Sequence, residues 1–152
     1  MYIVQRLFFA HRFAHHFQSL SLCVRCLSFD FIGTNPDESS EDVGTIQVPS
    51  NWKSVIQDPD TMSLFVFFYT NFEPPRSSKA MEALILLCSC RRSLFSTDRD
   101  RADFLQRLMN AVTILMKNQT GFQHEDNYHQ FCRLLGRLKA NYQLSELVKA
   151  DR

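Results

Sequence analysis

The chain has 152 residues, of which 45% are hydrophobic and 22% are charged, and 14 of them are phenylalanines. This length suits a single domain and this apolar content is enough for a core, which excludes a disordered or collagen-like protein. The net charge of +1 gives no whole-chain reason to expect nucleic acid as a partner.

The N-terminal stretch, residues 1–28, is apolar and basic and contains no acidic residue. Arginines and histidines interrupt it, so it has no run of about 18 apolar residues that could span a bilayer. A transit peptide or a basic helix on a membrane surface are alternatives. We expect instead a helix from about Leu20 to Phe29 that packs on the following chain, and we treat residues 1–19 as a separate segment.

Residues 30–50 read as a long acidic loop. Glycines and prolines disfavour a helix there, at Gly33, Pro36, Gly44 and Pro49. Acidic side chains cluster in the same stretch, at Asp37, Glu38, Glu41 and Asp42. The loop therefore suits either solvation or recognition of a basic partner.

Two helices are predicted directly after this loop. Ser50 or Asn51 caps a short helix that carries Trp52 and ends at Asp58. Asp60 or Thr61 then caps a helix over residues 62–72. Its apolar run, residues 64–69, has a single β-branched residue and no strand to pair with, so we predict helix and not strand.

The third predicted helix begins at Ser77 or Ser78, continues through Cys88 and ends in residues 91–95. It is apolar nearly all round, which predicts burial on more than one side. Thr97 and Asp100 have the spacing of a capping box for a helix that reaches Lys117.

Gly121 is able to close that helix in the left-handed conformation. The last helix starts near Glu125, with an inward stripe of Tyr128, Phe131, Leu135 and Leu138, and ends at Asn141.

These elements form two helix pairs, residues 51–95 and 97–141, each about 45 residues long, which is the period of HEAT or armadillo repeats. The predicted fold is all-α, with HEAT-like helical hairpins stacked as a short α-solenoid fragment and one long acidic loop. A four-helix bundle is the alternative.

No motif in the sequence indicates an enzyme or a cofactor. The five cysteines fall mostly within apolar helical runs, which predicts packed thiols in a reduced intracellular chain, and their spacing gives no set of four zinc ligands. His129 and Cys132 lie three apart and could in principle form a base and a nucleophile, but packing explains their helix better. We expect no catalytic residue, cofactor or metal.

Several short segments of the sequence, taken in chain order, resemble those of a known family. They are residues 29–34 (FDFIGT), 37–40 (DESS), 47–49 (QVP) with Trp52, 91–95 (RRSLF), and the dense run 127–149 that begins NYH and FCRLL. With this spacing they resemble the exportin-7 family, also called the Ran-binding protein 16 family, of importin-β superfamily transport receptors. The resemblance covers about Leu20 to Lys149, diverges over residues 71–87, and leaves residues 1–19 unmatched.

The resemblance implies a HEAT-repeat solenoid that binds Ran in its GTP form, protein cargo and nuclear pore proteins, with no nucleic acid or membrane as a partner. It also implies a role in nuclear export, with a location in the nucleus and the cytoplasm, including the nuclear pore complex. Because the family members are several times longer, residues 20–152 are expected to be an incomplete HEAT-repeat region from the N-terminal half of such a solenoid.

No partner-contacting motif of the family maps onto single positions here. Charge and spacing alone make Arg91, Arg92, Arg133 and Arg137 the candidate partner-binding residues. Two adjacent arginines near a helix end also favour the helix dipole. The alternative function is a stand-alone helical protein–protein interaction scaffold without a transport role.

Overall fold

The computed structural model describes residues 15–29, 31 and 46–150. Its α-helices are α2 (His16–Ser28), α3 (Lys53–Gln57), α4 (Pro59–Asn71), α5 (Arg76–Cys88), α6 (Asp98–Lys117) and α7 (Glu125–Ala150), with short 3₁₀ turns η2 (Ser50–Trp52) and η3 (Arg92–Leu94). The predicted all-α class is confirmed. Residues 1–14 and most of the predicted acidic loop lie outside the described ranges.

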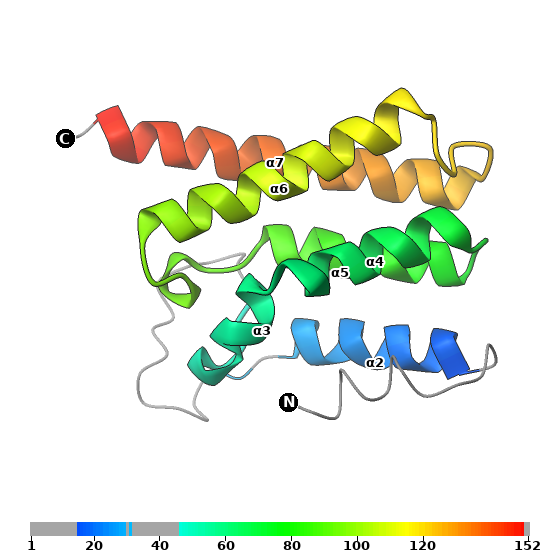
Figure 1. The fold of residues 1–152 in the computed structure, drawn as a ribbon, viewed down its shortest axis with the longest axis horizontal. Coiled ribbons are helices and arrows are strands. Elements are labelled where there is room, and N and C mark those ends of the chain that lie inside the picture. The colour runs from blue at the N-terminus through cyan, green and yellow to red at the C-terminus, as the bar shows by residue number, and fades with distance from the viewer. Residues whose placement is uncertain (1–14, 30, 32–45, 151–152) are drawn as a thin grey trace.

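Helix α5 lies at the centre of the molecule and contacts α2, α4 and α7, while α4 also contacts α6 (Figure 1). Along the chain, α4 and α5 form one antiparallel hairpin, and α6 and α7 form the next. Helices α2, α5 and α7 follow one another in a row, each packed on the next. This arrangement is that of stacked helical hairpins, as the 45-residue period predicts.

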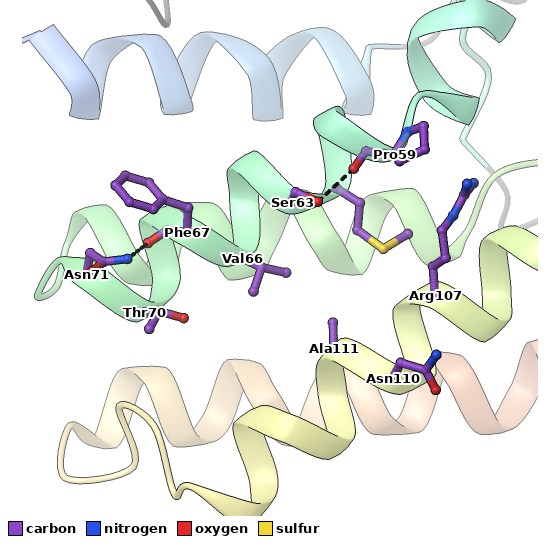
Figure 2. Close-up of a pocket in the computed structure, with 10 residues that line it drawn as sticks. Pro59, Ser63, Val66, Phe67, Thr70, Asn71, Arg107, Asn110 and Ala111 are labelled. Atoms are coloured by element: carbon purple, nitrogen blue, oxygen red, sulfur yellow. Dashed lines mark hydrogen bonds between the residues drawn. The ribbon is translucent and has the colours of Figure 1, made fainter.

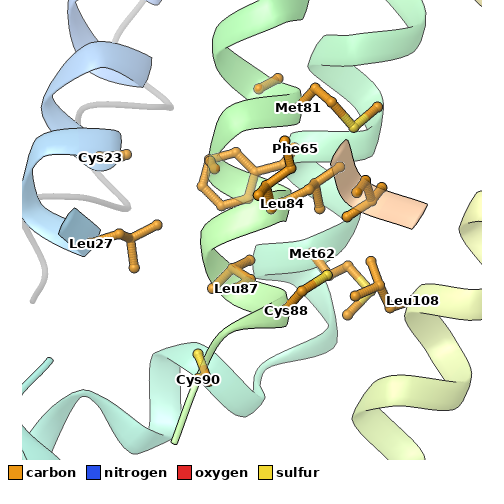
Figure 3. Packing of buried hydrophobic residues seen from close by; sticks show 14 of the residues in the cluster. Cys23, Leu27, Met62, Phe65, Met81, Leu84, Leu87, Cys88, Cys90 and Leu108 are labelled. Carbon is orange, nitrogen blue, oxygen red and sulfur yellow. The ribbon is translucent and has the colours of Figure 1, made fainter. Parts of the chain in front are cut away.

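The core follows from that central position (Figure 3). Helix α5 buries eight of its residues, among them Ala80 and Ala83, whose small side chains let neighbouring helices approach closely. Met81, Leu84 and Leu87 are each at most 1% exposed. Burying a side chain of this size stabilises a fold by about 1.5–3 kcal/mol, so α5 supplies much of the apolar stabilisation.

Four helix starts differ from the expectation. Helix α2 begins at His16 instead of about Leu20, and α3 follows the turn η2 without a side-chain cap from Ser50 or Asn51. Asp58 caps α4: its Oδ1 accepts a 2.9 Å hydrogen bond from the Asp60 backbone N–H, and Pro59 occupies the first helical position, where its missing N–H costs nothing. Asp60 and Thr61 are therefore inside the helix. Helix α5 begins at Arg76, after Pro75, and ends at Cys88, so Arg91 and Arg92 lie outside it. The two serines after Arg76 are consequently available for contacts with α7.

Helix α6 begins as the sequence predicts. The Thr97 side chain accepts from the Asp100 backbone N–H at 3.1 Å, and the Asp100 carboxylate accepts from the Thr97 N–H at 2.9 Å, which completes a capping box. After the helix, Gly121 has φ +76°, the left-handed conformation expected of it.

Helix α7 departs from the prediction in length and in register. It continues past Asn141 to Ala150, and no glycine or proline in residues 142–150 interrupts it. The Asn141 side chain instead donates a hydrogen bond to the Cys88 carbonyl at the end of α5. The inward stripe is Asn127, Phe131, Leu134 and Leu138, whereas Tyr128 and Leu135 are 50% and 36% exposed.

A cluster of polar contacts joins the tips of the two hairpins. The Ser77 and Ser78 hydroxyls each donate to Asn127 Oδ1 at 3.0 Å, and the Tyr69 hydroxyl donates to the Thr120 carbonyl at 2.9 Å. Asn127 is only 1% exposed, and burial raises the pKa of Tyr69 to about 12. These directional bonds, which we call the tip cluster, satisfy the Asn127 oxygen and three hydroxyl groups inside the inter-hairpin interface, while the buried Asn127 Nδ2 has no hydrogen-bond partner.

The C-terminal end of the predicted acidic loop is fixed against the end of α5. The Ile46 backbone N–H donates to the Ser89 carbonyl at 2.9 Å, which forms a single parallel bridge between Ile46 and Cys90. Ile46 and Val48 are both buried, so this end of the loop belongs to the core.

Candidate protein-interaction surfaces

The candidate arginines of the α5–α6 connection already have partners in the fold. Arg91 is only 5% exposed, and its Nη2 donates to the Val48 carbonyl at 3.1 Å. Arg92 is exposed and holds the Asp98 carboxylate with two hydrogen bonds, Nε to Oδ1 at 2.8 Å and Nη2 to Oδ2 at 2.6 Å. Both contacts join neighbouring segments of the chain, and burial leaves Arg91 little surface for a partner.

The two arginines of α7 lie at the surface. Arg133 and Arg137 are exposed, one helical turn apart, and Arg133 Nη1 donates to the Gln130 side chain at 3.0 Å. One turn after Arg137, Asn141 donates a hydrogen bond to the Cys88 carbonyl at the end of α5. Burial raises the pKa of Cys88 above its usual range, and the Arg137 charge acts in the opposite direction. Arg133 and Arg137 thus present two guanidinium groups to solvent on one flank of α7.

A groove separates α4 from α6 (Figure 2). It has a volume of about 440 Å³, and α4 contributes Pro59, Met62, Ser63, Val66, Phe67, Thr70 and Asn71, while α6 contributes Arg107, Asn110 and Ala111. Phe67 is 52% exposed at its edge. The sequence does not predict this groove, because the separation of α4 and α6 depends on packing and is not visible in helical periodicity.

The cysteines are mostly packing residues. Cys23, Cys88 and Cys90 are buried, and burial raises the pKa of Cys23 and Cys90 to about 12, so these thiols stay protonated near neutral pH. Cys132, by contrast, is exposed on α7. Among the described residues, no group of three or more histidine, cysteine or acidic side chains could hold a metal ion. In that same part of the chain, no helix has the length and apolarity needed to cross a membrane.

Comparison with known proteins finds relatives that match most of this chain. It is 46% identical over 134 residues to Exportin-7-A of Xenopus laevis, which covers 88% of this chain and 12% of that protein. It is 44% identical over 131 residues to Ran-binding protein 17 of Homo sapiens, and 42% identical over 129 residues to Ran-binding protein 16 of Drosophila melanogaster, covering 86% and 85% of this chain. No family model and no solved structure matches.

The chain thus spans about 12% of the length of these relatives. Identity at this level over most of the chain agrees with the resemblance of its short sequence segments to this family. It also agrees with the stacked hairpins of the fold. By its sequence the chain therefore belongs to the exportin-7 and Ran-binding protein 16 and 17 family, of whose members it matches one segment.

Proposed function

We propose that this chain supplies one segment of the protein-binding surface of a nuclear export receptor, which binds Ran in its GTP form together with protein cargo. The observation that carries the proposal is the 46% identity over 134 residues to a protein named Exportin-7-A, with relatives named for Ran binding at 42% to 44%. Passage through the nuclear pore, contact with pore proteins, and presence in both nucleus and cytoplasm are parts of the same proposal.

Within this segment, Arg133 and Arg137 are the proposed partner contacts. Both are exposed on one side of α7, and a guanidinium group binds carboxylates with two parallel hydrogen bonds. Arg92 is a weaker candidate because it already binds Asp98, and Arg91 is buried against Val48. The proposed partner surface is therefore the exposed flank of α7 that carries these two arginines.

The proposal assigns no catalytic step to the chain. His129 Nε2 lies 3.5 Å from Glu125 Oε1, and both side chains are more than two-thirds exposed, at 70% and 86%. Cys132 is also exposed, so water surrounds both members of the His129 and Cys132 pair. The described geometry gives them no enclosed site in which a substrate would be held.

The test uses the Xenopus laevis relative with its matched segment replaced by this chain. The replaced protein should bind Ran loaded with a non-hydrolysable GTP analogue and not Ran loaded with GDP in a pull-down assay. Arg133→Glu or Arg137→Glu should weaken that binding about tenfold, because a charge-assisted contact becomes repulsive. Lys139→Glu, the same charge change on another side of α7, is the control. Equal or absent binding to both nucleotide forms removes the proposal and leaves an interaction scaffold.

A further inference from the structure

The C-terminal end of α5 is bonded by segments that lie far from it in the sequence. A helix leaves its last carbonyl groups without partners inside the helix, so other donors must reach them. The carbonyls of Leu86 and Leu87 accept from the backbone N–H groups three positions later, at 2.9 Å and 3.3 Å. The next two carbonyls, those of Cys88 and Ser89, take their donors from elsewhere in the fold.

These two donors come from α7 and from the end of the predicted acidic loop. The Asn141 side chain donates to the Cys88 carbonyl, and the Ile46 backbone N–H donates to the Ser89 carbonyl at 2.9 Å. Cys88 and Ser89 are only 3% and 7% exposed. A buried carbonyl without a donor is costly, so α7 and residue 46 together complete the end of α5.

Arg91 adds a second link between the same segments, just after the helix (Figure 3 shows the neighbouring Cys88 and Cys90). Its side chain is buried, and Nη2 donates to the Val48 carbonyl at 3.1 Å. A guanidinium group that loses its acceptors in a buried position is strongly destabilising, so Arg91 holds residue 48 in place. We call residues 46–48, residues 88–91 and Asn141 the α5 junction.

The α5 junction adjoins the two arginines proposed as partner contacts. Arg137 lies one helical turn before Asn141 on α7, and Arg133 lies one turn before Arg137. The charge of Arg137 also acts on the thiol of Cys88. Because α7 is continuous through these positions, a movement of Asn141 away from α5 would displace both arginines as well.

The two hydrogen bonds at the end of α5 protect each other from water. They are made by adjacent residues, Cys88 and Ser89, so a donor segment that leaves one carbonyl admits water to the other. A hydrogen bond is stronger where water is excluded. Loss of Asn141 from the junction therefore weakens the bond made by Ile46, and the reverse holds equally.

We propose that the α5 junction couples residues 46–48 to the arginine flank of α7, so that docking of each segment favours docking of the other. A partner bound to Arg133 and Arg137 would then slow the opening of residues 46–48. By linkage, a contact that fixes residues 46–48 would strengthen binding at the two arginines by the same factor. The effect on partner binding rests on the proposed function, whereas the coupling itself belongs to the folded chain alone.

The first experiment measures hydrogen exchange of the Ile46 amide by NMR, under native conditions in which local opening dominates. Asn141→Ala should speed this exchange about tenfold, because the Ser89 carbonyl that binds Ile46 becomes accessible to water. Thr97→Ala, which removes a cap at the start of α6 and touches no junction residue, is the control and should leave the rate unchanged. Equal rates in Asn141→Ala and the unsubstituted chain would overturn the proposal.

The second experiment is a double-mutant cycle on the folding equilibrium constant, measured by urea unfolding. Arg91→Met and Asn141→Ala together should reduce this constant about tenfold less than the product of their separate effects, since either one already opens the junction. Arg91→Lys, which keeps the charge and loses the forked geometry, replaces Arg91→Met if that variant does not fold. Thr97→Ala combined with Asn141→Ala should give the simple product.

A simple product for the pair at positions 91 and 141 would overturn the coupling. Both experiments use this chain without any partner, so their outcome is independent of the pull-down with Ran. Failure of the coupling and failure of the proposed function can therefore be told apart.

Discussion

Gly121 and Gly136 are a matched pair for testing how the turn between α6 and α7 is held. Gly121 has φ +76°, and an added Cβ would lie 3.0 Å from both Asn127 Nδ2 and the Tyr69 hydroxyl, whereas a Cβ at Gly136 would meet nothing within 4 Å. We expect Gly121→Ala to lower the free energy of unfolding by about 2 kcal/mol and Gly136→Ala to raise it by about 0.5–1 kcal/mol. Urea unfolding followed by circular dichroism measures both; equal effects would contradict this account.

The buried thiols predict loss of stability at alkaline pH. Burial raises the pKa of Cys23 and Cys90 from 9.0 to about 12, so above pH 9.0 the unfolded chain releases these protons while the folded chain keeps them. Because the folded state then binds more protons, the free energy of unfolding falls as pH rises from 9.0 toward 12, by at most about 1.4 kcal/mol per pH unit for each thiol.

Urea unfolding between pH 7 and pH 10, under reducing conditions, checks this dependence. Cys90→Ala should reduce the slope with pH, while Cys132→Ser, at the exposed position, should leave it unchanged. A flat profile in the unsubstituted chain would show that these thiols are not shielded from water.

Among single residues, the sequence predicts those whose role is local. Thr97, Asp100 and Gly121 act on backbone within a few positions, so spacing alone identifies them. The sequence indicates Ser77 and Ser78 as helix caps, but their actual partner, Asn127, lies about 50 positions away and cannot be found from spacing. The burial of Arg91 against Val48, 43 positions away, cannot be predicted from spacing either.

The capping box at the N-terminus of α6 allows the contribution of a helix cap to the free energy of unfolding to be measured. Thr97→Ala removes one side of the capping box, and we expect the free energy of unfolding to fall by about 1–2 kcal/mol. Thr113→Ala is the matched control: Thr113 is on the same helix, and its hydroxyl bonds only to the Met109 carbonyl, an exposed local contact. Replacing it should change stability by no more than about 0.5 kcal/mol. Differential scanning calorimetry separates the two outcomes, and a similar loss in both would assign the effect to general helix propensity.

The helices were predicted from sequence because amphipathic stripes and breakers are properties of single segments. The register of α7 could not be predicted in this way. Tyr128 and Leu135 have the same spacing as the buried residues beside them, and only packing decides which stripe faces α5. The end of α7 was also missed, because Asn141 reads as a terminator but bonds to Cys88 of another helix.

For the whole molecule, the central position of α5 predicts an order of local stability. Its residues contact three other helices, so its amides should open only with the fold as a whole. We expect hydrogen–deuterium exchange to be slowest at residues 83–87, and at least about tenfold faster in α3, which has five residues and buries only Ile56. Exchange in α3 as slow as in α5 would contradict a fold organised around one helix.

The stacking of hairpins could be predicted from the repeat period. The family could be predicted from the short sequence segments that resemble it. The groove between α4 and α6 could not be predicted, because it depends on how far apart whole helices settle. Tyr128 and Leu135 read as core in the sequence, and only their neighbours show that they are exposed.

The tip cluster determines how far the two hairpins can slide along each other. Apolar side chains pack acceptably in several alignments, since dispersion has no preferred direction. A shift of one helical turn, about 5.4 Å, would strand the buried Asn127 oxygen and the Ser77 hydroxyl without partners. The Asn127 side-chain oxygen, which accepts hydrogen bonds from two serine hydroxyls, therefore sets the alignment of the two hairpins. It thereby also sets the spacing of the surface residues that a partner protein would contact.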